Sequence, residues 1–172
     1  MTRAPARLGL LAFSIVAVVL VADRVTTSLA LHHLHGTTHV WGPFGLALNF
    51  NSGLAFSLFT GRALIVTVLL CVGVVVLAVV VARVRTVVEA VGGGLVLGGA
   101  LGNLSERLIS DGHAGQVPDF ITLTHWPTFN VADAAVSFGV IVVAAALLLE
   151  HERLHPGSGA APAEAPAERT TP

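Results

Sequence analysis

Four long stretches of the chain are composed almost entirely of apolar residues, and polar residues gather between them. The stretches run over residues 8–31, 64–82, 87–104 and 131–149. A bilayer core about 30 Å thick is crossed by about 20 apolar residues in an α-helix. The pattern therefore predicts an all-α membrane protein with four transmembrane helices, which form a single domain over residues 1–154.

Arginines around these stretches predict the orientation of the helices. Four arginines precede the first stretch or lie in the tight turn between the second and third: Arg3, Arg7, Arg83 and Arg85. The positive-inside rule places them in the cytoplasm, together with both termini. The longer segments 32–63 and 105–130 then face outward, and they carry Arg62 and Arg107 against the rule.

The two ends of the chain add little to the predicted core. Residues 155–172 are rich in Ala, Pro, Gly and Glu without apolar periodicity, which predicts a disordered cytoplasmic tail. A cleaved signal peptide over the first 22 residues is the weaker interpretation. The start is basic and apolar, but no pair of small residues marks a cleavage site, and apolar character resumes beyond Arg24.

Composition excludes several classes of function. The chain is 54% hydrophobic and 11% charged with a net charge of -1, so no excess of positive charge indicates a nucleic-acid partner. Cys71 is the single cysteine and excludes an intramolecular disulfide and a multi-cysteine metal site. Four histidines in the first outer segment are irregularly spaced, with no carboxylate nearby: His32, His33, His35 and His39. We interpret them as a hydrated loop rather than a metal site.

Two aspartates near the predicted outer helix ends are the best candidates for chemistry. Asp119 and Asp133 are 14 residues apart, which is about 21 Å along one straight helix. The segment between them contains Pro127 and could fold back, with Gly115 and Pro118 just upstream. Two carboxylates in one partly dry site cannot both ionise easily. One would keep its proton as general acid and the other would activate water as general base, as in an aspartic protease.

Each acidic residue also has a plainer interpretation. Asn130 is a favourable N-cap, and Asp133 then falls at the third helical position, where the helix dipole favours an acid. Asp119 could be a carboxylate in a turn. Asp23 and Arg24 could pair with each other or with groups on neighbouring helices, in a structural role or at the site.

Glycines in the third stretch recur at every fourth position. Gly94, Gly98 and Gly102 would form one smooth helix face for close packing in lipid. A phosphate-binding loop is the weaker interpretation, because no P-loop lysine and no preceding strand accompany them.

Three blocks in order resemble the bacterial lipoprotein signal peptidases, the type II signal peptidases. They are NFNSGLAFS at 49–57, GGALGNL at 98–104 continuing to Arg107 and VPDFI at 117–121, and FNVAD at 129–133. With four spans, the resemblance covers roughly residues 8 to 150.

The resemblance implies an intramembrane aspartic endopeptidase. Its substrate would be a prolipoprotein carrying diacylglycerol on a cysteine, cleaved just before that cysteine, and the active site would face outward from the bacterial cell membrane. A small β-structured platform from the first loop would lie at the membrane surface among the phospholipids. The resemblance implies no metal or cofactor. Separately from the resemblance, we expect a monomer.

The resemblance also assigns residues. The two catalytic aspartates fall on Asp119 and Asp133, and Asp23 and Glu106 support the site. The substrate pocket would be lined by Asn51, Gly53, Ala55, Phe56, Asn103, Arg107 and Asn130.

Three departures from the family pattern keep two alternatives open. The family usually has Asp where Glu106 stands, Lys where Thr27 stands, and a shorter stretch at 109–116. Glu106 keeps the negative charge beside Arg107. These changes leave a catalytically weak or silent paralogue as one alternative. A proton-coupled transporter is the other, but it predicts acids across the whole membrane, whereas the second stretch has no charged residue.

Overall fold

Four long helices form the body of the protein. The computed structural model describes residues 3–36, 38–52, 63–109 and 115–154. The helices are α1 (Arg3–His33), α2 (Ala63–Val81), α3 (Val87–Ile109) and α4 (Val131–Leu154). Each contains a segment long and apolar enough to cross a membrane, so the four predicted spans are confirmed. The third extends to Ile109, beyond the predicted end at residue 104.

Large apolar side chains cover the outside of the helices. Val18 of α1, Val75 of α2 and Ile141 of α4 are each more than 60% exposed. Such a surface would aggregate in water and is stable only against lipid. In α3, half of the most apolar window is buried, against 22% or less in the other three helices. The third helix is therefore the centre of the bundle.

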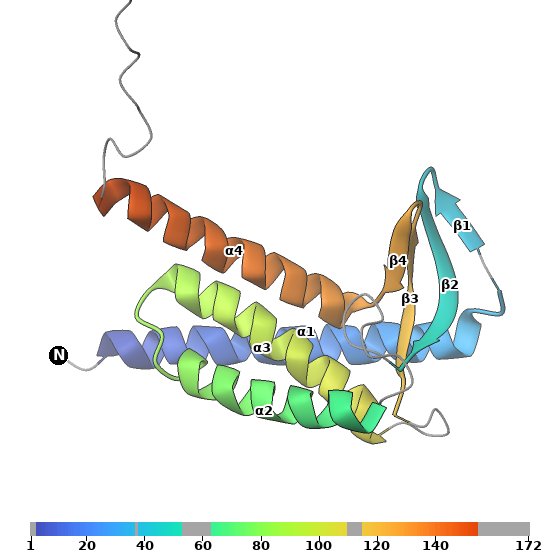
Figure 1. Ribbon diagram of the computed structural model, residues 1–172, viewed down its shortest axis with the longest axis horizontal. Coiled ribbons are helices and arrows are strands. Elements are labelled where there is room, and N and C mark those ends of the chain that lie inside the picture. Colours follow the sequence, from blue (N-terminus) through green and yellow to red (C-terminus); the bar gives the residue numbers. More distant parts are fainter. Residues whose placement is uncertain (1–2, 37, 53–62, 110–114, 155–172) are drawn as a thin grey trace, which may run out of the picture.

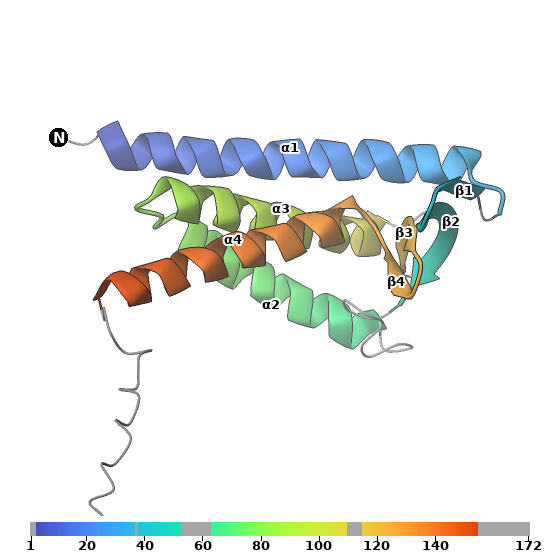
Figure 2. The same ribbon diagram turned by 90° about the horizontal axis from the view of Figure 1, so that it is seen from above.

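Glycines allow α3 to approach its neighbours closely (Figure 2). A Cβ atom added at Gly94 would lie 2.8 Å from the carbonyl oxygen of Ala12, and one at Gly98 would lie 2.9 Å from Cβ of Val19. The predicted packing face is thus confirmed and it meets α1. A second glycine surface was not predicted. A Cβ at Gly99 would lie 2.3 Å from the carbonyl oxygen of Ala132, so α4 packs on α3 by the same device.

A four-stranded antiparallel sheet stands at one end of the bundle (Figure 1). Its strands lie in chain order: β1 (Thr38–Trp41), β2 (Phe44–Asn51), β3 (Val117–Leu123) and β4 (Trp126–Phe129). The expectation that the platform comes from the first loop is therefore only half right. The second loop supplies two of the strands, and the central pairing of β2 with β3 joins the two loops.

The hairpin of β3 and β4 returns the chain from Asp119 to the start of α4. The predicted bend near Pro127 lies elsewhere, because Pro127 is inside β4. The turn is at Thr124 and His125, and His125 has a positive φ of 65°. That conformation is uncommon for residues other than glycine but is tolerated in tight turns. The fold-back is confirmed, with its position corrected.

The sheet lies at the opposite end of the bundle from the N-terminus (Figure 1). The turn between α2 and α3 and the end of α4 lie at the same end as the N-terminus. The predicted tail, residues 155–172, lies outside the described residues. Everything that positions the two aspartates is therefore at the sheet end.

Candidate active site

The two candidate aspartates come from different kinds of element. Asp119 is the third residue of β3, and Asp133 is the third residue of α4. Asp119 is only 2% exposed. The hairpin and the helix start bring both side chains to the junction of sheet and bundle.

Asn130 links the two carboxylates. Its side-chain amide nitrogen donates to Oδ1 of Asp119 at 3.1 Å. Its side-chain oxygen accepts the backbone N–H of Asp133 at 2.8 Å, and its own N–H reaches Oδ2 of Asp133 at 3.4 Å. Asn130 is thus the N-cap of α4, as predicted, and this reciprocal cap fixes Asp133 beside Asp119. The helix-start interpretation and the site interpretation describe the same arrangement.

Two further asparagines hold the remaining carboxylate oxygens. Asn51, at the end of β2, donates to Oδ2 of Asp119 at 3.0 Å. Asn103, from α3, donates to Oδ1 of Asp133 at 2.8 Å. The side chain of Asn130 also donates to Oδ1 of Asn103 at 3.1 Å, which closes the network. Three of the predicted pocket residues are therefore in contact with the aspartates or with each other.

Burial changes the acidity of Asp119, which lies outside the spans. Removal from water raises the pKa of Asp119, and the negative charge of Asp133 raises it further. The hydrogen bond from Asn51 and the positive charge of Arg107 oppose this effect. The pKa reaches about 7, against 3.8 for an unperturbed aspartate. Near neutral pH, a proton is therefore available at the site.

Arg107 is buried close to the carboxylates. Its guanidinium donates to the carbonyl oxygen of Gly115 at 2.9 Å, which ties the end of α3 to the residues before β3. The positive-inside rule does not place an arginine at this end of the bundle. The electrostatic interaction of Arg107 with Asp119 gives a local reason for its position. Its predicted role in contacting substrate stays a prediction.

Asp23 supports the start of α4 from the first helix. It is 1% exposed, and its Oδ1 accepts the backbone N–H of Ala132 at 2.9 Å. This satisfies one of the free N–H groups at the helix N-terminus. A Cβ at Gly102 would lie 2.9 Å from Oδ2 of Asp23, so the glycine makes room for the carboxylate. The sequence did not indicate this use of Gly102.

Arg24 and Glu106 form an ion pair between α1 and α3. Glu106 is buried, whereas the Arg24 side chain is half exposed. Of the two arrangements considered for Asp23 and Arg24, the structure has pairing with neighbouring helices. Glu106, which lies beside Arg107 in the sequence, forms this ion pair with Arg24 of α1.

The remaining predicted residues lie outside the site or outside the described residues. Gly53, Ala55 and Phe56 belong to residues 53–62, which the structure does not describe. His32 and His33 end α1 and contact the carbonyl oxygens of Ser28 and Leu29. Within the described part of the chain, no three His, Cys, Asp or Glu side chains gather closely enough to hold a metal ion.

A cavity beside Asp133 was not predicted. It has a volume of about 240 Å³ and is lined largely by aromatic and small side chains, among them Trp126, Phe129, Ala134 and Phe138. The only sequence signal was the cluster of aromatics around residues 126–129, next to the FNVAD block.

Comparison with known proteins identifies the family. The sequence profile of the family described as Signal peptidase (SPase) II matches residues 15–149. The chain belongs to the signal peptidase II family. The prediction of an aspartic endopeptidase of the lipoprotein signal peptidase type is thereby confirmed. The prediction that it cleaves signal peptides from lipoproteins is likewise confirmed.

Related signal peptidase II proteins cover most of the chain. A lipoprotein signal peptidase from Rhodococcus jostii is 40% identical over 149 residues, which are 81% of this chain and 73% of the relative. One from Mycobacterium leprae is 41% identical over 151 residues, 81% of this chain and 71% of the relative.

Two solved bacterial membrane enzymes share the fold. One superposes with a TM-score of 0.74 at 22% sequence identity, and the match covers 88% of this chain and 94% of the chain of that enzyme. The other has a TM-score of 0.69 at 24% identity, with 80% and 92% covered.

Proposed function

We propose that the protein removes the signal peptide from diacylglyceryl-modified prolipoproteins, and that Asp119 and Asp133 activate the attacking water. The observation that carries this proposal is the Asn130 side chain, which donates to Asp119 while it caps the helix that presents Asp133. Two carboxylates held by one intervening side chain are close enough to influence each other's charge.

The surroundings of the two aspartates favour one distribution of the proton. Asp133 lies in the first turn of α4, where the helix dipole and the amide of Asn103 stabilise a negative charge. Asp119 is buried beside that charge, and its pKa is raised to about 7. We therefore assign one shared proton to the pair at neutral pH and place it on Asp119, and the pair titrates as a unit.

This distribution supplies both groups that amide hydrolysis requires. The Asp133 carboxylate takes a proton from water as the water oxygen bonds to the scissile carbonyl carbon. Asp119 gives its proton to the carbonyl oxygen, which forms a neutral tetrahedral intermediate. The intermediate then returns a hydroxyl proton to Asp119, the amide nitrogen takes the proton from Asp133, and the C–N bond breaks. Both aspartates recover their starting states.

Four polar side chains hold the aspartates and the substrate during this reaction: Asn51, Asn103, Asn130 and Arg107. Each asparagine contacts a carboxylate oxygen, and Arg107 balances the negative charge of the pair. Fixed donors of this kind lower the reorganisation that the reaction requires.

The proposed orientation places the termini in the cytoplasm and the aspartates at the outer face of the cell membrane. Arginines near the N-terminus and in the turn between α2 and α3 support it, since both lie at the end of the bundle away from the sheet. A lipid-bearing substrate stays in the bilayer while its scissile amide meets water at the interface. A carboxylate pair at the helix ends suits both requirements.

The test is cleavage of a synthetic precursor by the purified protein in liposomes. The precursor carries a diacylglyceryl group on its cysteine, and a matched control has the same peptide with a free thiol. Mass spectrometry of the products should show cleavage immediately before the modified cysteine and none of the control. Equal cleavage of the control, or cleavage at another bond, would contradict the proposal.

A further inference from the structure

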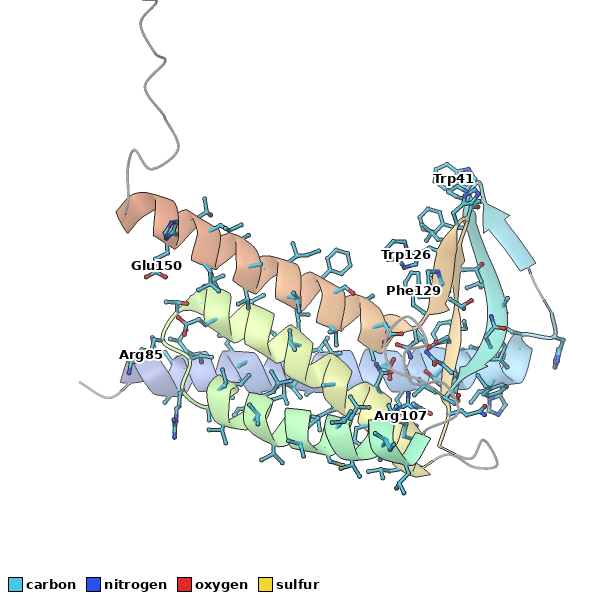
Figure 3. The ribbon with its side chains drawn as sticks, viewed as in Figure 1. Trp41, Arg85, Arg107, Trp126, Phe129 and Glu150 are labelled. Carbon is cyan, nitrogen blue, oxygen red and sulfur yellow. The ribbon has the colours of Figure 1, made fainter. Side chains whose placement is uncertain are left out.

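A cavity lies against Asp133, one of the two proposed catalytic residues. Asp133 and Asn51 form its polar end, and Trp126, Phe129, Ala134 and Phe138 form its apolar walls. Trp126 and Phe129 project from β4 on the side of the sheet that faces α4 (Figure 3). The cavity is thus a groove between the sheet and the first turns of α4.

The groove begins at the reacting groups and follows the first turns of α4, which is a candidate membrane span. Asp133 is a proposed catalytic residue, and the side chain of Asn51 holds Asp119. Phe138 lies five residues further along α4, which is about 8 Å deeper at 1.5 Å per residue. Phe138 is 64% exposed on the flank of α4 that also carries exposed Ile141. The deep end of the groove is therefore open to acyl chains.

We propose that this groove holds an acyl chain of the diacylglyceryl group on the substrate cysteine. The inference rests on the proposed function. Because the bond to be cut lies immediately before the lipidated cysteine, the glyceryl group leaves the peptide within a few bonds of the reacting carbonyl. Its chains must pass from the carboxylates into lipid, and the groove offers an apolar path from Asp133 to the exposed flank of α4.

The groove orients the chain rather than supplying net affinity. An acyl chain in the bilayer is already in an apolar medium, so its transfer into the groove gains little from the hydrophobic effect. Packing between Trp126, Phe129 and Phe138 restricts where the chain can lie, and so places the neighbouring amide against the carboxylates. We therefore expect changes in the groove to act mainly on kcat.

Fluorescence of Trp126 can report whether the chain occupies the groove. The protein has two tryptophans, Trp41 and Trp126, so Trp41→Phe leaves one emitter. Asp119→Asn added to this protein prevents turnover. In liposomes with excess unlabelled phospholipid, a stoichiometric precursor brominated on its acyl chains should quench Trp126. The same precursor with its bromine on a signal-peptide aromatic should quench it far less.

Quenching by either of two other molecules would overturn the groove assignment. One such result is stronger quenching from the brominated signal peptide than from the brominated chain, which would place the peptide in the groove. The other is quenching by brominated phospholipid that the unbrominated precursor does not relieve, which would indicate a resident membrane lipid.

A matched pair of substitutions tests the effect on the reaction. Ala134→Leu fills the groove, whereas Ala145→Leu adds the same bulk to the exposed face of α4. With a long-chain precursor, Ala134→Leu should lower kcat by about tenfold or more. A precursor with short acyl chains should be affected less, and Ala145→Leu should behave as wild type. Equal losses with long and short chains would contradict the assignment.

The two proposals fail in different ways. A wild-type protein that leaves the lipidated precursor uncut contradicts the proposed function, whatever the quenching shows. A wild type that cuts the precursor, combined with no quenching of Trp126 by the brominated chain, leaves the function intact and removes the groove assignment. Thermal melting of Ala134→Leu in detergent confirms that any loss of activity is not loss of fold.

Discussion

The side chain of Asn130 accepts the backbone N–H of Asp133 at 2.8 Å and donates its amide to Asp119 at 3.1 Å. Asn130 thus caps α4 and also links the carboxylate of Asp119 on β3 to the helix that carries Asp133. The cap needs only the side-chain oxygen, whereas the link to Asp119 needs the amide nitrogen. These two roles can therefore be separated by substitution.

Asn130→Ser should keep the cap and lose the link. Serine caps a helix about as well as asparagine, so the loss in the free energy of unfolding should come only from the lost hydrogen bonds to Asp119 and Asn103, about 1–3 kcal/mol. Without the donated hydrogen bond, Asp119 loses its alignment, and kcat should fall by about 100-fold. Asn130→Ala, which loses both roles, should in addition unfold more easily by about 1 kcal/mol. Cleavage assays and thermal melts of the two variants check this, and an active Asn130→Ser protein would contradict it.

The raised pKa of Asp119 predicts the direction of two pH effects. Cleavage should decline as pH rises through about 7, because Asp119 loses the proton that it donates. Stability should decline at lower pH, between the pKa of Asp119 in the unfolded chain and its pKa in the folded protein. The folded protein binds this proton more tightly than the unfolded chain, whose aspartate has a pKa near 3.8, so the free energy of unfolding falls as pH rises from 3.8 to about 7.

Asp119→Asn isolates the contribution that the ionisation of Asp119 makes to the pH dependence of stability. The variant should lose cleavage but should show a smaller decline in melting temperature between pH 5 and pH 8 than the wild type, since the buried group no longer ionises. Melts in detergent at both pH values measure it. An identical decline in both proteins would show that Asp119 is not the group responsible.

Gly102→Ala should disturb the site from the centre of the bundle. The added Cβ would lie 2.9 Å from Oδ2 of Asp23 and 3.1 Å from Cβ of Ala132, so the Asp23 carboxylate or the start of α4 must shift. We expect a loss of stability of about 1–3 kcal/mol and a fall in kcat. Gly73→Ala on α2 is the matched control, because a Cβ there meets no atom within 4 Å. Similar melting temperatures and rates for both variants would refute this packing argument.

The ion pair of Arg24 and Glu106 should show strong coupling. Arg24→Gln leaves a buried carboxylate without its partner and should cost about 1–3 kcal/mol, less than for a fully buried pair because Arg24 is half exposed. Arg24→Gln combined with Glu106→Gln should recover most of that loss. A double-mutant cycle from thermal melts measures the coupling, and additive losses would mean that the pair contributes nothing.

The helices were predictable because each follows from its own local sequence. An uninterrupted apolar run such as that of α2 is sufficient to define a membrane span. The sheet was not predictable in this way, because its central strand pair brings together residues that are far apart in the chain, such as Asn51 and Val117. Short strands with mixed polarity carry no signal of such a partner. The platform was therefore assigned to the first loop alone.

The site was predictable as far as its residues form local motifs. Asn130 and Asp133 show the spacing of a helix cap, and the resemblance added Asn51, Asn103 and Asp119. The contact of Asp23 with the backbone of Ala132 depends on how three helices cross, and so does the pairing of Glu106 with Arg24. The order of residues along the chain does not encode these crossings directly.

The central claim is that Asp133 activates water together with Asp119. It is tested most directly by assaying purified wild type and Asp133→Asn side by side on the diacylglyceryl-modified precursor in liposomes. The substitution keeps the size of the side chain, so both proteins should fold. We predict cleavage by the wild type and a rate at least about 1,000-fold lower for the variant. A folded Asp133→Asn protein that cleaves within about tenfold of the wild-type rate would contradict the account.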